Sequence, residues 1–320
     1  MSFFGGGTDY PEYFSRHRGA VVGMAINRYI YISVSQISSF VNYKYRLSYS
    51  SLEMVHNISE IKHPVVRAVF EEYGIDQPLD VSIISNSPAS AGLGSSSSFT
   101  VGLLNLIAAL RDERVTKLDL AKKAIYIEQE VLEENVGVQD QLHASYGGIN
   151  RFDFTDNRIR ISPLQMTGEC QRYFLDSLML VFTDITRHAS KVVEDQVGKT
   201  LRGENDKNLE RFLEMTDEAV DILEDRNPDE LIRRFGALID ESWRIKRQLS
   251  ATVSNPTIDS LYEACLRHGA LGGKLLGAGS GGFLLVVVPP EQQEQFVERV
   301  GGVKIEKIDI DTMGSIIQHS

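Results

Sequence analysis

The chain has 320 residues, which is enough to bury a large core in one big domain or two medium ones. Its 44 acidic and 33 basic residues give a formal net charge of −11, so nucleic acid and anionic membranes are not expected as partners. Only two cysteines occur, Cys170 and Cys265, and with no signal peptide in view they indicate a reducing cytoplasm without disulfides or a zinc site.

The first half of the chain begins as sheet. β-Branched and aromatic residues dominate residues 20–34 and recur in YKYRLSY and LDVSIIS, which predicts strands. Apolar residues three and four apart then predict two helices, at SSSSFTVGLLNLIAAL and LDLAKKAIYIEQEVLEE. A turn and a further strand are expected at YGGINRFDF.

Polar, glycine and proline residues cluster at residues 155–168, and we place a domain boundary there, giving domains 1–165 and 166–320. The second half opens with a strand at LMLVFT and continues with three long charged amphipathic helices to about residue 249, then a fourth around residue 261. A strand at 283–288, a helix at 291–300 and a strand at 303–308 complete it. Strands and helices do not alternate regularly, so an α+β fold is favoured over a doubly wound sheet.

The stretch SPASAGLGSSSSFTVGLL, residues 87–104, places two glycines and four serines directly before an apolar helix. Gly92 and Gly94 permit unusual backbone conformations, and a serine is a good N-cap. Such a loop turns its backbone N–H groups towards one point at the positive end of a helix dipole, where a phosphate can bind. The serine hydroxyls could then bond a phosphate oxygen or ligate Mg²⁺. The alternative is an ordinary strand-loop-helix joint with a serine cap.

Two other glycine patterns are not nucleotide motifs. GAGSGG, residues 277–282, is followed by a strand, whereas a dinucleotide fingerprint has a strand before it and a helix after it. VGKT, residues 197–200, lacks the first glycine of a Walker A loop and lies in a polar helical pattern. The histidines and serines show no zinc-ligand or hydrolase spacing either.

Glycine-rich segments also occur at FFGGGTDYPEY and GGKLLGAGSGGF, each next to a hydroxyl, a carboxylate or a lysine. Between the phosphate loop and the last segment, Glu128 is expected on a helix and Asp140 in a turn-like segment beyond it. One carboxylate could bind a metal and the other accept a proton, as phosphoryl transfer requires. The alternative is a solvated acidic face, which we expect for Glu130, Glu133 and Glu134.

PASAGLGSSSS, ENVGVQDQLHASYGG and GGKLLGAGSGGF resemble, in order, the three motifs of the GHMP kinases, the superfamily of galactokinase, homoserine kinase, mevalonate kinase and phosphomevalonate kinase. The resemblance implies a ribosomal-protein-like α+β N-terminal domain, a ferredoxin-like C-terminal domain, and ATP with Mg²⁺ between them. It implies that Asp140 is the catalytic base and that Ser96 and Glu128 bind Mg²⁺. ATP binding is assigned to Pro88, Ala91, Gly92, Leu93, Gly94, Ser95, Ser96 and Ser97. Substrate binding is assigned to Gly6, Gly7, Thr8, Asp9, Asp140, Arg187, Gly277, Gly279, Ser280 and Gly281. Of these, Gly277, Gly279 and Gly281 would keep the nucleotide and substrate side of the cleft open.

Within that superfamily, SFFGGGTDYPEYF with VGVQDQ is most similar to bacterial sugar 1-kinases that act on D-glycero-D-manno-heptose 7-phosphate, with fucokinase-type enzymes nearby. The resemblance implies that Thr8 and Asp9 bond sugar hydroxyls. Arg187 would hold a substrate phosphate, but Asp184 stands where those kinases have glycine and would oppose an anion, so a helix-surface charge is an equal alternative.

The sequence therefore predicts an ATP-dependent kinase that phosphorylates the anomeric hydroxyl of a heptose phosphate or related sugar, with a homodimer as a candidate assembly. The alternatives are a kinase for fucose or a natural-product sugar, and a catalytically silent sugar or nucleotide sensor. Glu128 and Asp140 together argue against the sensor.

The start of the chain gives one further expectation. Similar kinases have a short strand ending in arginine before the residues matching SFFGGGTD, and Met1 stands in the place of that arginine. We expect a form extended upstream by about one strand, ~5–6 residues, to be more stable and more active. Alternatively another cation, Arg16, Arg18 or Lys274, substitutes.

Overall fold

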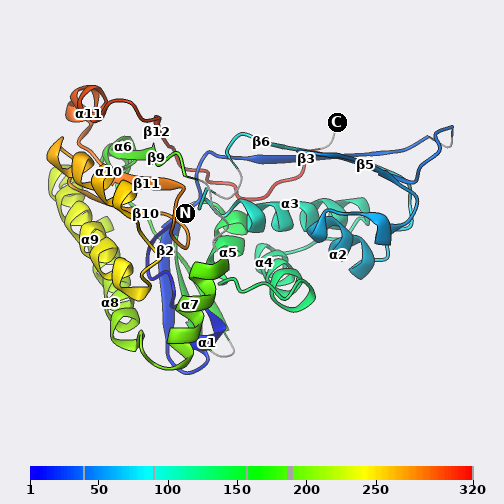
Figure 1. Ribbon diagram of the computed structural model, residues 1–320, viewed down its shortest axis with the longest axis horizontal. Coiled ribbons are helices and arrows are strands. Elements are labelled where there is room, and N and C mark those ends of the chain that lie inside the picture. Colours follow the sequence, from blue (N-terminus) through cyan, green and yellow to red (C-terminus); the bar gives the residue numbers. More distant parts are fainter. Residues whose placement is uncertain (39, 89–90, 156–157, 186–189, 319–320) are drawn as a thin grey trace.

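The computed structural model describes residues 1–38, 40–88, 91–155, 158–185 and 190–318. These residues form three four-stranded sheets with helices packed against them, as Figure 1 shows. The α+β class predicted from the sequence agrees with this arrangement.

The first sheet has the strand order β1-β2-β7-β8, and all its neighbours are antiparallel. A short helix, α1, and the first glycine-rich segment connect its first two strands. The bounds are β1 (Ser2–Phe4), α1 (Pro11–Phe14), β2 (Gly19–Met24), β7 (Ile149–Thr155) and β8 (Arg158–Pro163). Because β8 lies within residues 155–168, that stretch is not only a linker, and the division at residue 165 stays a prediction.

The second sheet has the order β3-β6-β4-β5, in which only β4 and β6 are parallel. Helices α2 and α3 lie on one face of it in Figure 1 and bury a separate hydrophobic cluster with it. The bounds are β3 (Ile30–Gln36), β4 (Tyr45–Ser48), β5 (Leu52–Val55), a 3₁₀ turn (Ile58–Glu60), α2 (Pro64–Glu72) and β6 (Leu79–Ser85). The apolar run at residues 20–34 is therefore two strands, β2 and β3, that belong to different sheets.

Three helices and a π turn follow the second sheet: α3 (Ser95–Leu110), α4 (Lys117–Tyr126), the π turn η2 (Ile127–Val131) and α5 (Gln139–Tyr146). The helix predicted at SSSSFTVGLLNLIAAL is confirmed over all of its residues. The predicted serine cap is wrong, because the cap position is Gly94 in the left-handed conformation and no side chain caps the helix. A glycine is needed there because its φ of +71° is unfavourable for a residue with a Cβ.

The third sheet has the order β10-β11-β9-β12, with antiparallel neighbours throughout. Its strands are β9 (Leu178–Phe182), β10 (Gly272–Leu275), β11 (Phe283–Val287) and β12 (Ile305–Lys307). The helices of this half are α6 (Gly168–Asp176), α7 (Ser190–Leu201), α8 (Asp206–Leu223), α9 (Pro228–Leu249), α10 (Pro256–Arg267), η3 (Pro290–Gln292) and α11 (Gln293–Val300). The predicted strands and helices of this half are confirmed, whereas α6 and β10 were not predicted.

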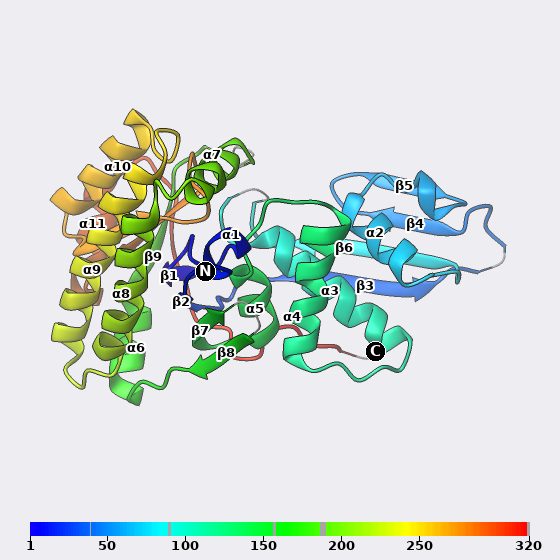
Figure 2. The ribbon, with the colours of Figure 1, turned by 90° about the horizontal axis from the view of Figure 1, so that it is seen from below.

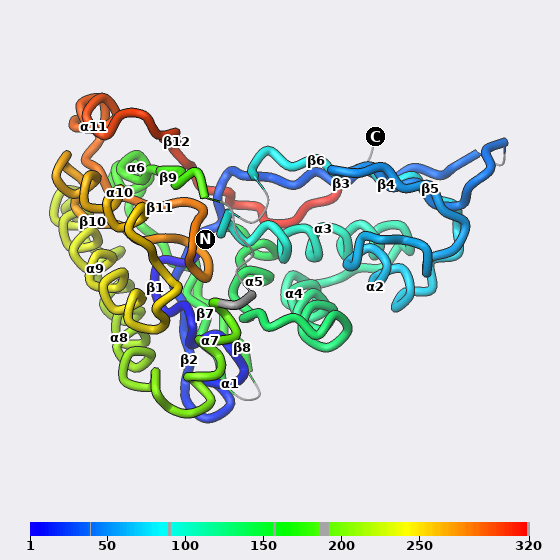
Figure 3. The backbone as a smooth tube through the Cα atoms, in the orientation of Figure 1, coloured from blue at the N-terminus to red at the C-terminus, as the bar shows by residue number. Residues whose placement is uncertain are grey.

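The largest hydrophobic cluster joins the start of the chain to the C-terminal helices. Phe235 of α9 makes edge-to-face contacts with Phe3, Phe4 and Phe174, at centroid distances of 5.2, 5.3 and 4.8 Å. Figure 2 and Figure 3 show β1 beside α8 and α9. This packing fixes the position of the glycine-rich loop that begins directly after β1.

None of the helices that the structure describes is long and apolar enough to cross a membrane.

Candidate active site

The loop between β6 and α3 has the conformation that its glycines suggest. Gly92 and Gly94 have φ angles of +77° and +71°, and Gly94 directly precedes Ser95, the first residue of α3. A Cβ atom placed on Gly94 would lie only 2.9 Å from the carboxyl carbon of Asp140. The candidate phosphate loop and the candidate base are therefore in direct contact.

The third glycine-rich segment, between β10 and β11, packs against the same loop. A Cβ on Gly92 would lie 2.7 Å from the carbonyl oxygen of Leu276, and a Cβ on Gly277 would lie 2.6 Å from the Cα of Gly92. The two backbones can approach this closely only because both residues are glycines. Two of the three motifs thus meet at one place, although about 180 residues separate them in the sequence.

Other glycines of the third segment are also explained by contacts within the chain. A Cβ on Gly279 would lie 2.8 Å from the carbonyl oxygen of Val253, and Gly281 is closed in by backbone in the same way. Ser280 donates its hydroxyl to the carbonyl of Thr252 at 2.6 Å. Their predicted role, to leave room for nucleotide and substrate, stays a prediction.

Glu128 lies in the π turn rather than in a regular helix, and its side chain is fully buried. Oε2 of its carboxyl accepts hydrogen bonds from the Ser97 hydroxyl, at 2.9 Å, and from the Gln141 amide nitrogen. Within the described residues Oε1 has no hydrogen-bond partner. Burial raises the pKa of Glu128 to about 7, while the side chains of Thr100, Gln141 and Ser97 lower it. The serine that contacts Glu128 is thus Ser97, whereas the predicted metal ligand Ser96 is exposed.

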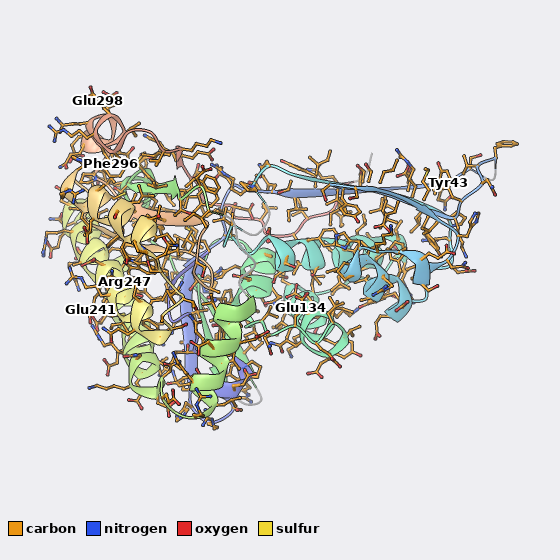
Figure 4. All side chains as sticks on the ribbon, viewed as in Figure 1. Tyr43, Glu134, Glu241, Arg247, Phe296 and Glu298 are labelled. Atoms are coloured by element: carbon orange, nitrogen blue, oxygen red, sulfur yellow. The ribbon has the colours of Figure 1, made fainter. Side chains whose placement is uncertain are left out.

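The acidic residues after Glu128 were expected to form a solvated face. Glu130 and Glu133 are exposed, as predicted. Glu134, labelled in Figure 4, is half-buried instead, and its backbone N–H donates to the carbonyl of Glu128 at 2.9 Å. Glu134 therefore closes the π turn rather than only facing solvent.

Asp140 lies in the first turn of α5 and not in a turn-like segment. Burial raises its pKa above the ordinary value for an aspartate. A raised pKa brings a carboxylate closer to the value that suits a general base. The role of Asp140 as the catalytic base stays a prediction, with which its contact to Gly94 and its raised pKa agree.

Asp9, in the first glycine-rich loop, is fully buried beside the same helix. Its Oδ1 accepts a hydrogen bond from the Gly7 N–H at 2.9 Å, and its Oδ2 accepts one from the Gln139 N–H at 3.3 Å. Burial raises the pKa of Asp9 to about 6, and the charge of Asp140 contributes in the same direction. Asp9 therefore fixes the first motif to the start of α5, and a sugar contact would use the remaining acceptor capacity of its carboxylate.

Thr8 does not have the surroundings that its predicted contact with sugar hydroxyls requires. Its buried hydroxyl lies 2.8 Å from the carbonyl of Gly5, 2.9 Å from the carbonyl of Ala20 and 3.0 Å from the N–H of Ala20. A hydroxyl has one proton to donate, and here the backbone already uses it. The geometry does not support a sugar contact for Thr8, whereas Gly6 remains partly open beside the Gln139 side chain.

Two domains of a known family match the sequence around these residues. Residues 59–148 match the N-terminal domain of the GHMP kinases, and residues 229–303 match the C-terminal domain of the same family. The chain belongs to the GHMP kinases. The predicted family is therefore confirmed, and this GHMP kinase is an ATP-dependent phosphotransferase that acts on an alcohol group.

Among curated proteins, this GHMP kinase is 29% identical over 314 residues to the D-glycero-alpha-D-manno-heptose 7-phosphate kinase of Campylobacter jejuni, covering 93% of this chain and 90% of that protein. It is 24% identical over 313 residues to the bifunctional fucokinase/GDP-fucose pyrophosphorylase of Arabidopsis thaliana, covering 90% of this chain and 29% of the plant protein. Among solved structures, it superposes on a D-glycero-D-manno-heptose 1-phosphate kinase from Bacteroides thetaiotaomicron with a TM-score of 0.78 and 19% identity, covering 98% and 94% of the two chains. The predicted two-domain GHMP kinase fold is thereby confirmed.

GHMP kinases use ATP, typically with Mg²⁺, and the oxygen donors of this GHMP kinase suit that ion. Mg²⁺ prefers oxygen ligands and binds through one or two carboxylates together with substrate phosphates. Glu128 provides a buried carboxylate oxygen without a partner among the described residues, and the Ser97 hydroxyl contacts the same carboxyl. The residues of the site thus fit a bound Mg²⁺.

Two lysines, the buried Lys274 and the partly buried Lys246, lie at the third glycine-rich segment. Lys274 of β10 donates from Nζ to the carbonyl of Phe3 at 2.7 Å, and Lys246 of α9 donates to the carbonyls of Leu275, at 3.0 Å, and Gly277. Burial lowers the pKa of Lys246 to about 8 and lowers that of Lys274 well below its ordinary value. The GGK sequence pointed to Lys274, whereas Lys246 was missed because it looks like an ordinary charge on an amphipathic helix.

Arg16 and Arg18, which the sequence offered as alternatives to Lys274, interact with other parts of the chain. Arg16 donates to the carbonyls of Glu12 and Thr200. Arg18 is half exposed and pairs with Asp153 and Asp217, both at 3.3 Å. Of the three cations Arg16, Arg18 and Lys274, Lys274 is therefore the one that donates a hydrogen bond to β1.

The remaining predicted residues have mixed outcomes. Arg187 lies outside the described residues, and Asp184, three positions before it, is exposed with a φ of +57°. Leu93 of the phosphate loop packs against the largest hydrophobic cluster, whereas Pro88 is exposed.

Proposed function

We propose that this GHMP kinase transfers the γ-phosphoryl group of ATP to the anomeric hydroxyl of D-glycero-D-manno-heptose 7-phosphate or a closely related sugar. The observation that carries the proposal is the contact between the Asp140 carboxyl and Gly94 of the phosphate loop. It brings a proton acceptor to the loop that would hold the transferred group. The similarity to the heptose 7-phosphate kinase of Campylobacter jejuni supports the substrate class.

In the proposed mechanism the protein contributes mainly positioning and charge. Backbone N–H groups at Gly92, Gly94 and Ser95 hold the phosphates at the N-terminus of α3. Asp140 accepts the proton of the sugar hydroxyl as that oxygen attacks the γ-phosphorus in line with the leaving oxygen of ADP. A Mg²⁺ ion held by Glu128 and a serine hydroxyl would neutralise phosphate charge when bound.

Lys274 and Lys246 complete the electrostatic environment. Lys274 lies within the third glycine-rich segment and Lys246 beside it, and the hydrogen bonds of both, within the described residues, go to backbone carbonyls. Negative charge on the transferred phosphoryl group would offset the cost of burying these two cations. We assign them to stabilisation of that charge.

The acceptor is expected beside the first glycine-rich loop. A small cavity there is lined by Gly7 and Tyr10 of the loop region, by Gln196 of α7 and by Asn205, which directly precedes α8. The amides of Gln196 and Asn205 are of the type that bonds sugar hydroxyls. Of the predicted acceptor residues, Gly6, Gly7 and Asp9 are retained in this proposal.

Two other functions remain as alternatives. The similarity to the plant fucokinase/pyrophosphorylase makes a fucose-type sugar the second acceptor candidate. A catalytically silent sensor is the third, and the presence of both the buried Glu128 and Asp140 argues against it, because a sensor does not need a base.

ADP release separates these functions. The chain is assayed with ATP and Mg²⁺ over heptose, heptose 7-phosphate, fucose and mannose, with ADP coupled to a reporter reaction. We expect the highest kcat/KM with heptose 7-phosphate. A higher value with fucose would favour the fucose-type kinase, and no ADP above background with any aldose or aldose phosphate would favour the sensor.

A further inference from the structure

The two oxygens of the Glu128 carboxylate have unequal surroundings. Oε2 accepts hydrogen bonds from Ser97 and Gln141, whereas Oε1 has no partner within the part of the chain that the structure describes. A carboxylate oxygen has about two lone-pair sites, so two donors occupy Oε2 fully. The Thr100 hydroxyl is also near this carboxyl but donates to the carbonyl of Ser96 at 3.2 Å. Glu128 can therefore offer one oxygen to a ligand, and that oxygen is Oε1.

Gln141 is placed unusually for a glutamine that only fills space. Its side chain is fully buried, its nitrogen donates to Glu128, and its own oxygen has no donor among the described residues. A buried amide with an unsatisfied oxygen is unfavourable, and an apolar side chain of the same length would avoid that penalty. The amide is thus better explained by its action on Glu128 than by packing.

The elements around these residues restrict the carboxylate further. Glu128 lies in the π turn, a type of helical distortion that frequently occurs at functional sites. Gln141 follows Asp140 on α5, and Ser97 lies in the first turn of α3. Hydrogen bonds from two helices therefore fix the orientation of one carboxylate oxygen on a third element.

We propose that Gln141 and Ser97 are positioning residues that make Glu128 a one-oxygen metal ligand and thereby favour Mg²⁺ over Ca²⁺. Mg²⁺ requires a nearly octahedral shell of six close oxygens, which a single carboxylate oxygen suits. Ca²⁺ accepts six to eight ligands and readily takes both oxygens of a carboxylate. Removing one of the two donors to Oε2 should allow Glu128 to bind a metal ion through both carboxylate oxygens. This inference rests on the proposed function, since it presumes a metal–nucleotide complex.

The test measures metal preference rather than turnover. Mg²⁺ and Ca²⁺ are titrated separately at a fixed ADP concentration, and binding to the intact chain is followed by calorimetry. In Gln141→Met the ratio of Ca²⁺ to Mg²⁺ affinity should rise by about 3- to 10-fold, the equivalent of one ordinary hydrogen bond. Ser97→Ala frees the same oxygen, so it carries the same prediction if Gln141→Met does not fold.

Gln129→Met is the matched control. The Gln129 amide donates to the carbonyl of Val136 at 2.7 Å, so this variant loses a hydrogen bond of the same π turn without touching the Glu128 carboxyl. Its Ca²⁺ to Mg²⁺ ratio should equal that of the wild type.

Two results would overturn the inference, and they can be told apart. If the wild type binds ADP in a metal-dependent way but the ratio is unchanged in both Gln141→Met and Ser97→Ala, the two residues have only a structural role. If the wild type shows no metal-dependent binding of ADP, the proposed function fails together with the inference.

Discussion

Gly94→Ala tests the contact on which the proposed function depends. The new Cβ would lie 2.9 Å from the Asp140 carboxyl carbon, and since carbon atoms pack best at about 3.5–4.0 Å, the carboxyl must move by about 0.6 Å or more. The φ of +71° adds a backbone strain of about 1–2 kcal/mol for a residue with a Cβ. Displacements of this size can lower a rate by about 100-fold. We therefore expect kcat to fall by about two orders of magnitude.

Gly74→Ala separates the displaced base from the strained backbone. Gly74 has a φ of +57°, and a Cβ placed on it would meet nothing within 4 Å. Both variants should lose a similar free energy of unfolding, visible as a decrease in thermal midpoint of about 2–4 °C. Only Gly94→Ala should lose activity in an ADP-release assay. If both variants kept wild-type kcat, or both lost it equally, the contact with Asp140 would not matter for the reaction.

Three further changes test individual roles. Asp140→Asn should lower phosphoryl transfer by about 10²–10⁴-fold and leave ATP binding intact, because an amide cannot accept the proton; near-wild-type turnover in the ADP-release assay would mean that another group is the base. Glu128→Gln should raise the Mg²⁺ concentration needed for half-maximal turnover, since a neutral amide oxygen is a poorer ligand than a carboxylate, and an unchanged requirement would contradict the metal role. Ser96→Ala should raise that concentration too, and an unchanged concentration would mean that Ser96 is not the hydroxyl ligand. Finally, kcat/KM should fall as the pH decreases through the pKa of Asp140, which burial raises above 3.8, because the protonated base is inactive; a pH–rate profile that stayed flat down to that value would contradict this assignment.

Much of the fold follows from local sequence patterns. The helix Ser95–Leu110 was predicted over its whole length, because helical spacing of apolar residues and a preceding glycine act within a few residues. The division of residues 20–34 between two sheets could not be predicted, since strand pairing depends on partners far away in the sequence. Strand β10 was missed for a related reason, because its sequence GGKL has weak strand propensity and is held between α9 and β11.

The candidate site, like the fold, was predicted from the sequence only in part. Glycines and carboxylates in order along the chain pointed to the phosphate loop and to Asp140, because this chemistry needs those residue types. The sequence could not show that Gly92 and Gly277 are glycines because they contact each other. It also could not show which serine faces Glu128, since that depends on the rotation of α3 and on the π turn. Neither the partly buried Lys246 nor the buried amide of Gln141 has a sequence pattern that distinguishes it from surface residues.

The measurement that tests the central claim most directly is the ³¹P NMR spectrum of a reaction of the purified chain with Mg²⁺, ATP and D-glycero-D-manno-heptose 7-phosphate. The account predicts a new phosphate ester signal, coupled to the anomeric proton of the sugar, that grows together with ADP and is absent with Asp140→Asn. A spectrum in which ATP is consumed only to ADP and inorganic phosphate, or in which the new ester is on another hydroxyl, would contradict the proposed sugar 1-kinase.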